Sequence, residues 1–479
     1  MQHAFRGSRR LFAFLSACAL ISAAFAAGAS AHAVSKSKGH HHHGNGGGGN
    51  GSVMIDQGVN WGTVPAIGGA PATPASLYTL QNSNGMVVKI TNYGGVVQSI
   101  WVPDKRGNAT NVALGFSTLS DYVNDFTQGA LGTPWPAPGG SGDTFFGAII
   151  GRYANRIANA SFPLNNTTYT LDANNGPNTL HGGYLGWNTV VWGATPSMGP
   201  GSASLTLTHT FPAGEGCDKT ANVATPCTGT GFPAAVDATV VYTLTSDNQL
   251  KITYAAKNTD PKLSTVINLT NHTYFNLGGE ASGSVENQLL QINSNQYTPV
   301  NANLIPEPPY FVNVAGTAYD FRQLTPIGEN IRNTNLPDGF TAPAGQLKQL
   351  QIAHGYDNNW VLNGYPGYRL VSTAEDPANG IFLKTFTDQP GVQFYSSNFL
   401  VGDLIGTSGN VYRQTQGFTL ETQHYPDSPH HQGDPAWPSV VLGPGDTFNS
   451  VTSYQIGTKG NGHGDHGHHH GHHRSHRKH

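Results

Sequence analysis

The sequence contains little charge for its length. Only 11% of its 479 residues are Asp, Glu, Lys or Arg, and the formal net charge is −3. Nucleic acids and anionic membrane surfaces are bound through clustered Lys and Arg residues, which a weakly charged and nearly balanced chain does not supply. We therefore expect neither kind of partner, and a small neutral molecule fits the composition better.

Long apolar runs are absent except near the N-terminus. Arg9 and Arg10 precede an apolar stretch, residues 11–27, and small residues follow it. This stretch is short for a membrane span but typical of the apolar part of a signal peptide. We predict that residues 1–33 are a signal peptide, that no membrane span follows, and that the protein is exported (periplasmic or secreted). The paired arginines also fit a twin-arginine signal, so general secretory and twin-arginine export both stay open.

Cysteine is scarce, with three residues in the chain. Cys18 belongs to the predicted signal peptide, which leaves Cys217 and Cys227 in a loop rich in Gly, Thr and Pro. In an oxidising compartment the default state of two such cysteines is a disulfide. No histidine or further cysteine lies near them in the sequence, so a metal site at this loop is not expected.

Sustained helical periodicity and internal repeats are also absent, whereas Gly (61) and Pro (30) are abundant. Apolar residues alternate with Thr over residues 205–211, and two alternating runs at 240–244 and 250–254 flank a turn, as in a β-hairpin. Residues 86–90 and 96–102 show the same arrangement. The pattern predicts an all-β fold, a large antiparallel β-sandwich that forms a single domain over residues 76–458.

Low-complexity segments flank the predicted domain. Residues 34–75 read as a His/Gly-rich linker with an N-terminal extension, and residues 459–479 as a disordered His-rich tail. Neutral imidazoles in such tracts bind Ni²⁺, Zn²⁺ or Cu²⁺, and we expect weak metal binding there. A solubilising tail and a purification tag remain alternatives.

Two segments far apart in the sequence each place one titratable side chain in a strand-like run. These side chains are His272, among Asn, Thr, Tyr and Phe, and Glu421, within Phe418-Thr-Leu-Glu. A Glu inside an apolar run is uncommon unless it is paired or functional. An imidazole and a carboxylate with no metal or phosphate motif beside them suit proton transfer on a neutral substrate rich in hydroxyl groups.

Further polar residues lie in similarly apolar surroundings. Arg152 and Arg156 offer donors in a fixed fork that suit sugar hydroxyls or a carboxylate, and we expect Arg152 to form a structural ion pair instead. His181 precedes two glycines that let the backbone approach a ligand, although a lone His is more often structural. Asp357 stands at the entry to an apolar strand with Trp360, where it either forms a turn or binds sugar hydroxyls.

Taken in their order, these segments resemble the aldose 1-epimerase (galactose mutarotase) family. The resemblance runs through nearly the whole predicted β region. It rests on the following segments: Ile90-Thr-Asn-Tyr-Gly-Gly95, Val102-Pro-Asp104, Leu114-Gly-Phe116, Gly151-Arg-Tyr-Ala-Asn-Arg-Ile157, Leu180-His-Gly-Gly183, Asn268-Leu-Thr-Asn-His272, Tyr319-Asp-Phe-Arg322, Gly355-Tyr-Asp357, Gly391-Val-Gln-Phe-Tyr395, Leu420-Glu-Thr-Gln423 and Leu442-Gly-Pro-Gly445. Each segment is a weak motif by itself, but the ordered set is specific.

The resemblance implies a galactose mutarotase-like β-supersandwich and an enzyme that interconverts the α- and β-anomers of free hexoses such as glucose and galactose. It implies that His272 is the general acid and Glu421 the general base, with no cofactor and no metal. It also implies contacts with the sugar from five further residues, which are Asn155, Arg156, His181, Asp357 and Gln393. All of these positions match the family's motifs, so an active enzyme is expected.

Two stretches depart from the family's pattern and leave the substrate range open. Residues 217–228 read as an insertion, and residues 125–143, directly before the arginine motif, are longer than usual and are candidates to shape or cover the sugar site. Two other readings of the whole chain remain, a carbohydrate-binding β-sandwich without catalysis and an exported protein whose His-rich ends bind metal. A glycosidase with two carboxylates is less consistent, because only one strand-embedded carboxylate accompanies the histidine.

Overall fold

The computed structural model describes residues 51–127, 143–218, 227–333, 335–340 and 348–459. The predicted signal peptide and both His-rich tracts lie outside the described residues. So do residues 128–142 and 219–226, which make up most of the two stretches that depart from the family's pattern. Within the described part of the chain, strands dominate and helices are short. None of these helices has the length and apolar character that crossing a membrane would require.

The largest sheet has nine strands, and all of its neighbours pair antiparallel. Their order across the sheet is β12 (Gly193–Gly199), β13 (Ser202–Phe211), β14 (Val236–Thr245), β15 (Gln249–Asn258), β31 (Thr447–Thr458), β25 (Ile381–Thr387), β24 (Arg369–Glu375), β19 (Leu289–Ile292) and β22 (Thr325–Pro326).

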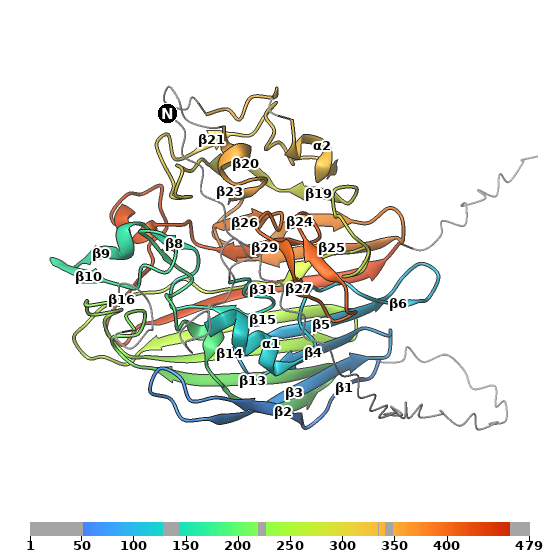
Figure 1. The fold of residues 1–479 in the computed structure, drawn as a ribbon, viewed down its shortest axis with the longest axis horizontal. Helices are drawn as coiled ribbons and strands as arrows, with labels where there is room; N and C mark the ends of the chain where they lie inside the picture. Colours follow the sequence, from blue (N-terminus) through green and yellow to red (C-terminus); the bar gives the residue numbers. More distant parts are fainter. Residues whose placement is uncertain (1–50, 128–142, 219–226, 334, 341–347, 460–479) are drawn as a thin grey trace, which may run out of the picture. The chain divides into compact units, whose positions relative to one another are not determined.

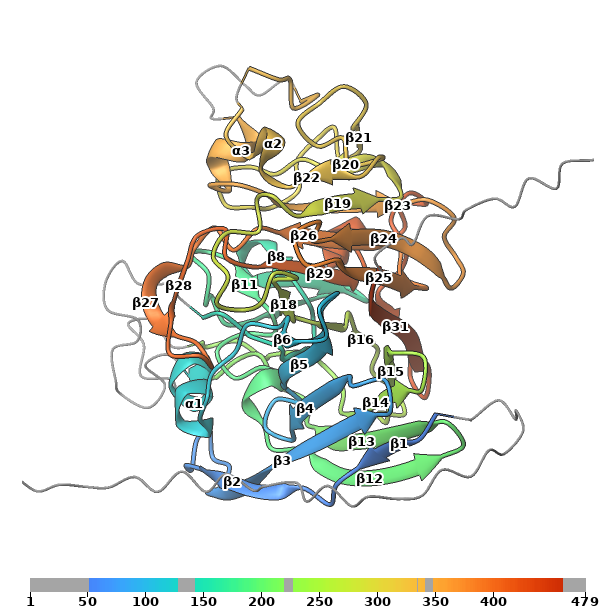
Figure 2. The ribbon, with the colours of Figure 1, turned by 90° about the vertical axis from the view of Figure 1, so that its right-hand side faces the viewer.

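A six-stranded sheet near the start of the described chain packs against this large sheet. Its path is β1 (Val53–Ile55), β3 (Thr73–Asn82), β4 (Val87–Thr91), β5 (Val97–Pro103) and β6 (Ala109–Asn111), and β2 (Val59–Val64) also pairs with β3. Strand β3 contacts β13 and β14, and β5 contacts β31. Figures 1 and 2 show the blue strands β3 to β5 against the green strands β13 to β15.

A second six-stranded sheet carries most of the polar residues singled out above. Its order is β18 (Tyr274–Phe275), β29 (Phe418–Gln423), β26 (Gly391–Tyr395), β23 (Asp357–Leu362), β20 (Ser294–Thr298) and β21 (Val312–Asn313). Leu420 and Phe394 of this sheet belong to the same buried apolar cluster as Leu205 and Val240 of the large sheet. One continuous core therefore supports all three sheets.

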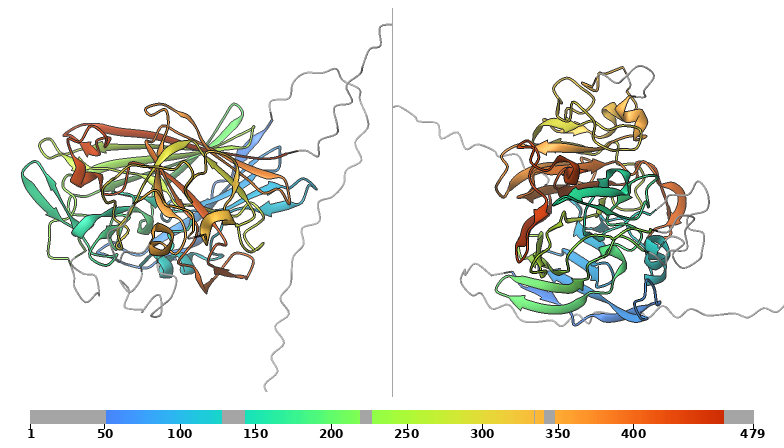
Figure 3. Two further views of the ribbon diagram at one scale, coloured as in Figure 1. Left: turned by 90° about the horizontal axis from the view of Figure 1, so that it is seen from above. Right: turned by 90° about the vertical axis from the view of Figure 1, so that its left-hand side faces the viewer.

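Short strand pairs and helices complete the described fold. The pairs are β7 (Ile149–Ile150) with β17 (Thr270–Asn271), β8 (Arg156–Ile157) with β11 (Thr179–Leu180), β9 (Ser161–Leu164) with β10 (Thr167–Thr170), β16 (Thr265–Val266) with β30 (Val441–Leu442), and β27 (Val401–Ile405) with β28 (Val411–Arg413). The helices are α1 (Leu119–Thr127), α2 (Gly328–Ile331) and α3 (Gln349–Ile352), with 3₁₀ turns η1 (Ala158–Ala160), η2 (Trp187–Thr189) and η3 (Ser428–His431). Figures 2 and 3 show the orange hairpin β27–β28 beside α1.

The predicted mostly β, antiparallel architecture is confirmed, and each predicted hairpin is present. The runs at 240–244 and 250–254 lie in β14 and β15, which pair antiparallel. The runs at 86–90 and 96–102 correspond to β4 and β5. In both hairpins the alternating apolar residues face the core because successive side chains of a strand point to opposite faces.

Two features differ from the sequence-based expectation. Strands β1 and β2 lie before residue 76, where we expected the sandwich to begin, because the edge of β3 offers them free backbone partners. Helix α1 was not predicted, although Leu119, Tyr122 and Phe126 recur at helical spacing and are buried. The Thr118 hydroxyl accepts a hydrogen bond from the backbone N–H of Asp121, as an N-cap residue does.

Candidate active site

The second six-stranded sheet brings residues that are distant in sequence onto adjacent strands. Glu421 on β29 is paired with Gln393 on β26, and Asp357 at the start of β23 is paired with Tyr395 at the end of β26. Residues paired across an antiparallel sheet share one face. The register therefore places two carboxylates on the same face of three neighbouring strands.

His272 meets Glu421 from the connection between β17 and β18. Its Nε2 atom lies 3.4 Å from Glu421 Oε1, and both side chains are at least nine-tenths buried. Glu421 Oε1 also accepts a hydrogen bond from Thr419 Oγ1 at 2.9 Å. Glu421 Oε2 is buried and has no hydrogen-bond partner among the described residues. One carboxylate oxygen is thus held by the protein, and the other is buried without a partner among the described residues.

Asn155 and His181 fix one another through their backbones. The N–H of Asn155 donates to His181 Nδ1 at 3.1 Å, and the N–H of His181 donates to the Asn155 carbonyl at 3.1 Å. Both residues have left-handed backbone conformations, with φ of 64° and 53°. Such conformations cost energy for residues other than glycine and persist where the surroundings enforce them, often at functional sites. The His181 ring stands edge-on to the His272 ring, with centroids 5.1 Å apart.

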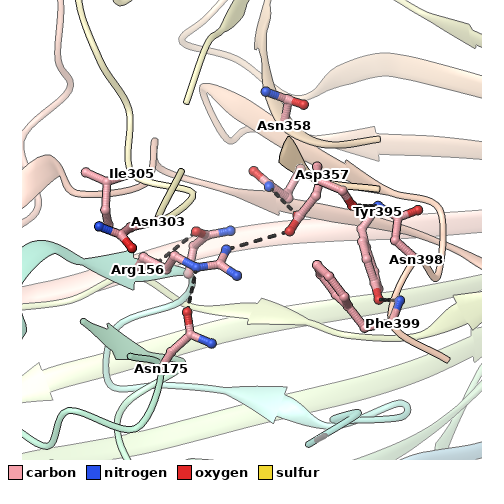
Figure 4. A network of polar contacts seen from close by, with 12 residues as sticks. Arg156, Asn175, Asn303, Ile305, Asp357, Asn358, Tyr395, Asn398 and Phe399 are labelled. Atoms are coloured by element: carbon pink, nitrogen blue, oxygen red, sulfur yellow. Dashed lines mark hydrogen bonds and ion pairs between the residues drawn. The ribbon is translucent and has the colours of Figure 1, made fainter. Parts of the chain in front are cut away.

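Arg156 and Asp357 form a second, looser charged pair. The distance from Arg156 Nη1 to Asp357 Oδ2 is 3.7 Å, and Arg156 Nε donates to Asn175 Oδ1 at 3.0 Å. Gln393 Nε2 donates to Asp357 Oδ1 at 2.8 Å and so braces this carboxyl group. Figure 4 shows Arg156 between Asn175 and Asp357, with dashed lines marking both contacts.

These side chains surround a cavity of about 510 Å³. This volume is in the range of roughly 300–1,000 Å³ that is usual for small-molecule sites. Its wall combines polar side chains with aromatic rings. The lining residues are Phe126, Thr127, Asp143, Thr144, Phe145, Asn155, Arg156, Asn174, Asn175, Gly176, Pro177, Asn178, Leu180, His181, Tyr184, His272, Tyr274, Ala302, Asn303, Leu304, Asp357, Tyr395, Phe399, Leu400 and Glu421.

Burial shifts the pKa values of the facing acid and base in opposite directions. Desolvation raises the pKa of Glu421 to about 8, opposed by the hydrogen bond from Thr419 and reinforced by the nearby Asp357. Desolvation also lowers the pKa of His272 to about 3. Because burial disfavours whichever form is charged, the two groups together hold one proton over the whole neutral range.

The neighbouring groups are shifted for the same reason. Burial, together with the charges of His272 and Arg156, holds the pKa of His181 well below its usual range. Burial raises the pKa of Asp357, and Arg156 and Gln393 partly oppose this shift. His181 is therefore neutral at physiological pH. Its Nδ1 accepts a backbone N–H, so its Nε2 carries the ring proton and is a hydrogen-bond donor.

The ligand atoms of His181, His272 and Glu421 lie within 4.8 Å of one another, which is close enough to test as a metal site. A histidine ligates a metal through an unprotonated ring nitrogen. In His181, however, Nδ1 is engaged by the Asn155 N–H and Nε2 carries the proton. Ligation by His181 would require breaking that hydrogen bond, so the donor set does not fit a resident metal.

Comparison with known families and proteins agrees with this geometry. The sequence model of the aldose 1-epimerase family matches residues 76–455. The chain belongs to the aldose 1-epimerase family. The enzyme is 32% identical to galactose mutarotase of Rattus norvegicus over 396 residues, which cover 83% of this chain and 97% of that protein. It is 34% identical to aldose 1-epimerase of Escherichia coli K12 over 386 residues, 80% of this chain and 95% of that protein.

Solved structures share the fold of the epimerase. Galactose 1-epimerase from Lactobacillus acidophilus superposes with a TM-score of 0.63 at 24% identity, covering 85% of this chain and 99% of that one. An aldose epimerase homologue from Caenorhabditis elegans gives a TM-score of 0.61 at 23% identity, covering 78% and 97%. The enzyme is an isomerase that interconverts the α- and β-anomers of aldoses, as the family resemblance implied.

Six of the seven residues predicted for the site of the epimerase line the cavity, and Gln393 does not. Gln393 lies on the same face of the sheet as Asp357 and donates its side-chain N–H to that carboxyl group. Gln393 therefore supports a carboxyl group that lines the cavity. Its Oε1 atom is buried without a hydrogen-bond partner among the described residues.

The expectation that Arg152 is structural is confirmed. Its Nε lies 2.6 Å from Glu215 Oε1, and its Nη1 donates to the carbonyls of Pro233 and Ala234. The predicted disulfide between Cys217 and Cys227 is present.

The wall of the cavity also contains residues that sequence reasoning missed. Phe145, Tyr274, Tyr395 and Phe399 supply aromatic surface, and Asn175 holds Arg156. Tyr274 and Tyr395 sit in the same motifs as His272 and Gln393, so the period-2 rule applied outward from those residues could have found them. No comparable signal marks Phe145, whose left-handed backbone (φ 56°) is a product of the folded chain.

Proposed function

We propose that Glu421 and His272 are the base and the acid of anomer interconversion, and that the substrate is a free aldohexose bound in the 510 Å³ cavity. The observation that carries the proposal is the 3.4 Å approach of His272 Nε2 to Glu421 Oε1 at the wall of this cavity. An acid and a base so close together can act on O5 and O1 of one sugar, since both oxygens are bonded to C1.

Ring opening needs two proton transfers and no added reagent. Glu421 takes the proton of the C1 hydroxyl, the O–H electron pair becomes the second bond of the C1 carbonyl, and the C1–O5 bond breaks. O5 then receives the proton of His272 Nε2. Rotation about C1–C2 presents the other face of the aldehyde, and the reverse transfers close the ring and restore both groups. Each positioned proton transfer typically contributes about 10²–10⁴-fold to the rate.

The buried pair starts from a proton distribution that the substrate can change. In the empty cavity, burial favours neutral Glu421 and neutral His272, while the reaction needs the carboxylate and the imidazolium. These two forms contain the same number of protons, so no proton has to enter from solvent. A sugar hydroxyl that donates to Glu421 and a ring oxygen that accepts from His272 both favour the charged form.

The remaining polar residues bind the hydroxyl groups of the sugar that are distant from C1. Asp357 accepts hydrogen bonds, Arg156 donates them, and His181 donates from Nε2 because its Nδ1 is occupied. Asn155 contacts both Arg156 and His181. Its side-chain oxygen accepts the backbone N–H of Arg156 at 2.8 Å, and its own N–H donates to His181 Nδ1. Such positioning keeps the open-chain aldehyde in place between opening and closure.

Substitution of the two central residues tests the proposed roles. We expect Glu421→Gln and His272→Asn each to lower kcat for α-glucose mutarotation at least about 10³-fold, because each removes one proton transfer. Polarimetry of freshly dissolved α-glucose, corrected for the spontaneous reaction, measures the rate. Circular dichroism checks that each variant is folded.

Exposed Glu329, remote from the cavity, provides the matched control. Glu329→Gln makes the same chemical change and is expected to retain the wild-type rate. A Glu421→Gln or His272→Asn variant with near-native kcat would overturn the roles assigned here. Loss of activity in Glu329→Gln as well would point to a general defect of preparation.

We also propose that the enzyme works outside the cytoplasm after removal of residues 1–33. The composition of this segment and the Cys217–Cys227 disulfide support export, because disulfides persist in oxidising compartments. Fractionation of cells that express the full chain is expected to recover mature enzyme in the periplasm or medium. Exclusively cytoplasmic, unprocessed protein would contradict export. Replacing Arg9 and Arg10 by Lys separates the two routes, since this change blocks twin-arginine export.

A further inference from the structure

The two oxygens of Glu421 have different surroundings. Oε1 accepts the Thr419 hydroxyl at 2.9 Å and faces His272 Nε2 at 3.4 Å. Oε2 is buried and has no hydrogen-bond partner among the described residues. The hydrogen bond from Thr419 therefore sets the orientation of the Glu421 carboxyl group at the wall of the cavity.

Strand β29 places the Thr419 hydroxyl next to Oε1 of Glu421. It lies two residues before Glu421 on β29, and side chains at this spacing point to the same face of the sheet. Tyr274 on β18 and Tyr395 on β26 are its cross-strand partners. Thr419 is fully buried between these rings, and its branched Cβ restricts rotation of the hydroxyl.

We propose that Thr419 is a positioning residue that fixes Oε1 of Glu421 and so holds the carboxyl group in place to receive the proton of the C1 hydroxyl. The inference rests on the base role proposed for Glu421. In the opening step the proton moves from O1 to the Glu421 carboxylate while the C1–O5 pair moves to O5, which takes the His272 proton. In closure Glu421 returns its proton to O1 on the opposite face of the sugar.

The hydroxyl of Thr419 also stabilises the charged form of its partner. A hydrogen bond donated to a carboxylate favours ionisation, and Thr419 is the strongest influence that opposes the effect of burial on Glu421. Titratable and charged groups from other elements also face Glu421, and these are Arg156, His181, His272, Tyr274, Asp357, Tyr395 and Tyr454. Thr419 differs from them because its hydroxyl donates at every pH and carries no charge.

The pH profile of Thr419→Val tests the inference, because valine keeps the shape of the side chain and removes the donor. We expect kcat to fall about 10- to 100-fold, the range for losing a hydrogen bond to a charged group, with little change in KM. On the alkaline side, kcat falls when the pair loses its one proton, which burial places on Glu421. Without the Thr419 hydroxyl the carboxyl group keeps this proton to a higher pH, so the alkaline limb of the kcat profile should move upward by about one pH unit. Thr419→Ser, which restores the donor, should recover both the rate and the limb.

A purely structural role gives a different outcome. A structural role would lower the melting temperature and the rate of Thr419→Val without moving the alkaline limb of its kcat profile. Thr419→Ala would then resemble Thr419→Val in melting temperature and in rate. An unmoved limb, or a limb moved equally in Thr419→Ser, would overturn the inference. The parallel Glu421→Gln measurement separates the two proposals. If Glu421→Gln is inactive while Thr419→Val has a native profile, only the positioning role fails; if Glu421→Gln is active, the base role itself fails.

Discussion

Arg152 and Arg156 lie four residues apart and are both buried, but their surroundings differ. Each of the three nitrogens of Arg152 has an acceptor in the protein, with Glu215 at 2.6 Å and the carbonyls of Pro212, Pro233 and Ala234. Arg156 faces the cavity, where its contact with Asp357 is 3.7 Å long. One guanidinium is held by the protein at every nitrogen, and the other lines the cavity.

A related contrast separates two buried carboxyl groups of the enzyme. Glu215 Oε1 receives Arg152 Nε and, at 3.1 Å, Trp187 Nε1, whereas Glu421 Oε1 meets a histidine that burial keeps neutral, at 3.4 Å. A buried charge that contacts a counter-ion inside the protein contributes to folding, because removing its partner leaves an uncompensated charge. A buried acid that contacts no counter-ion lowers stability. Stability and activity should therefore respond oppositely at the two kinds of site.

The largest effect on stability is expected at Arg152. Arg152→Met would leave the buried carboxyl group of Glu215 without its counter-ion, and losing one partner of a buried pair costs about 3–5 kcal/mol. Urea denaturation followed by tryptophan fluorescence measures the loss in the free energy of unfolding. We expect the KM of the folded fraction to stay close to that of the wild type, since Arg152 does not line the cavity.

Arg156→Met is the matched control and should show the reverse. The contact between Arg156 and Asp357 is looser, at 3.7 Å, and Gln393 still donates to Asp357 when Arg156 is removed, so we expect a loss of less than about 2 kcal/mol, the smaller cost of a lost hydrogen bond. The KM for glucose should rise and kcat/KM should fall about 10- to 100-fold, the equivalent of about 1.4–3 kcal/mol of lost binding. If Arg156→Met were less stable than Arg152→Met, the comparison between the two arginines would fail.

The sequence was sufficient for the parts of this contrast that depend on local pattern. Period-2 alternation predicts β13, β14 and β15, and the strand-embedded Glu421 marks itself because a charge in an apolar run needs a reason. The pairing of His272 with Glu421 came from the family resemblance. The geometry now shows that the two side chains are in contact.

Other features could not be predicted because they arise from long-range register. The contact of Gln393 with Asp357 follows from the pairing of β26 with β23, and the contact of Asn175 with Arg156 is made close to the pairing of β8 with β11. The unequal oxygens of Glu421 depend on a hydroxyl two residues away that sequence alone does not distinguish from any other strand threonine. Helix α1 is different, since its N-cap and apolar spacing were present in the sequence and were missed.

A further effect on stability concerns Glu421 itself and depends on pH. Its pKa is about 8 in the folded protein against an ordinary value of 4.5, so between these values the folded state binds more protons than the unfolded state. Wild-type stability is therefore lost as pH rises through this window.

Glu421→Gln lacks the titrating group. The variant should gain about 2–3 kcal/mol relative to wild type between pH 5 and pH 9, less than the full linkage value because water and side-chain movement relieve part of the cost. Urea denaturation at both pH values measures the gain, with the exposed Glu329→Gln as a control that should show no such trend. A constant difference between variant and wild type would mean that Glu421 is not held at a cost, and the contrast between the Arg152–Glu215 pair and the groups that line the cavity would then fail at Glu421.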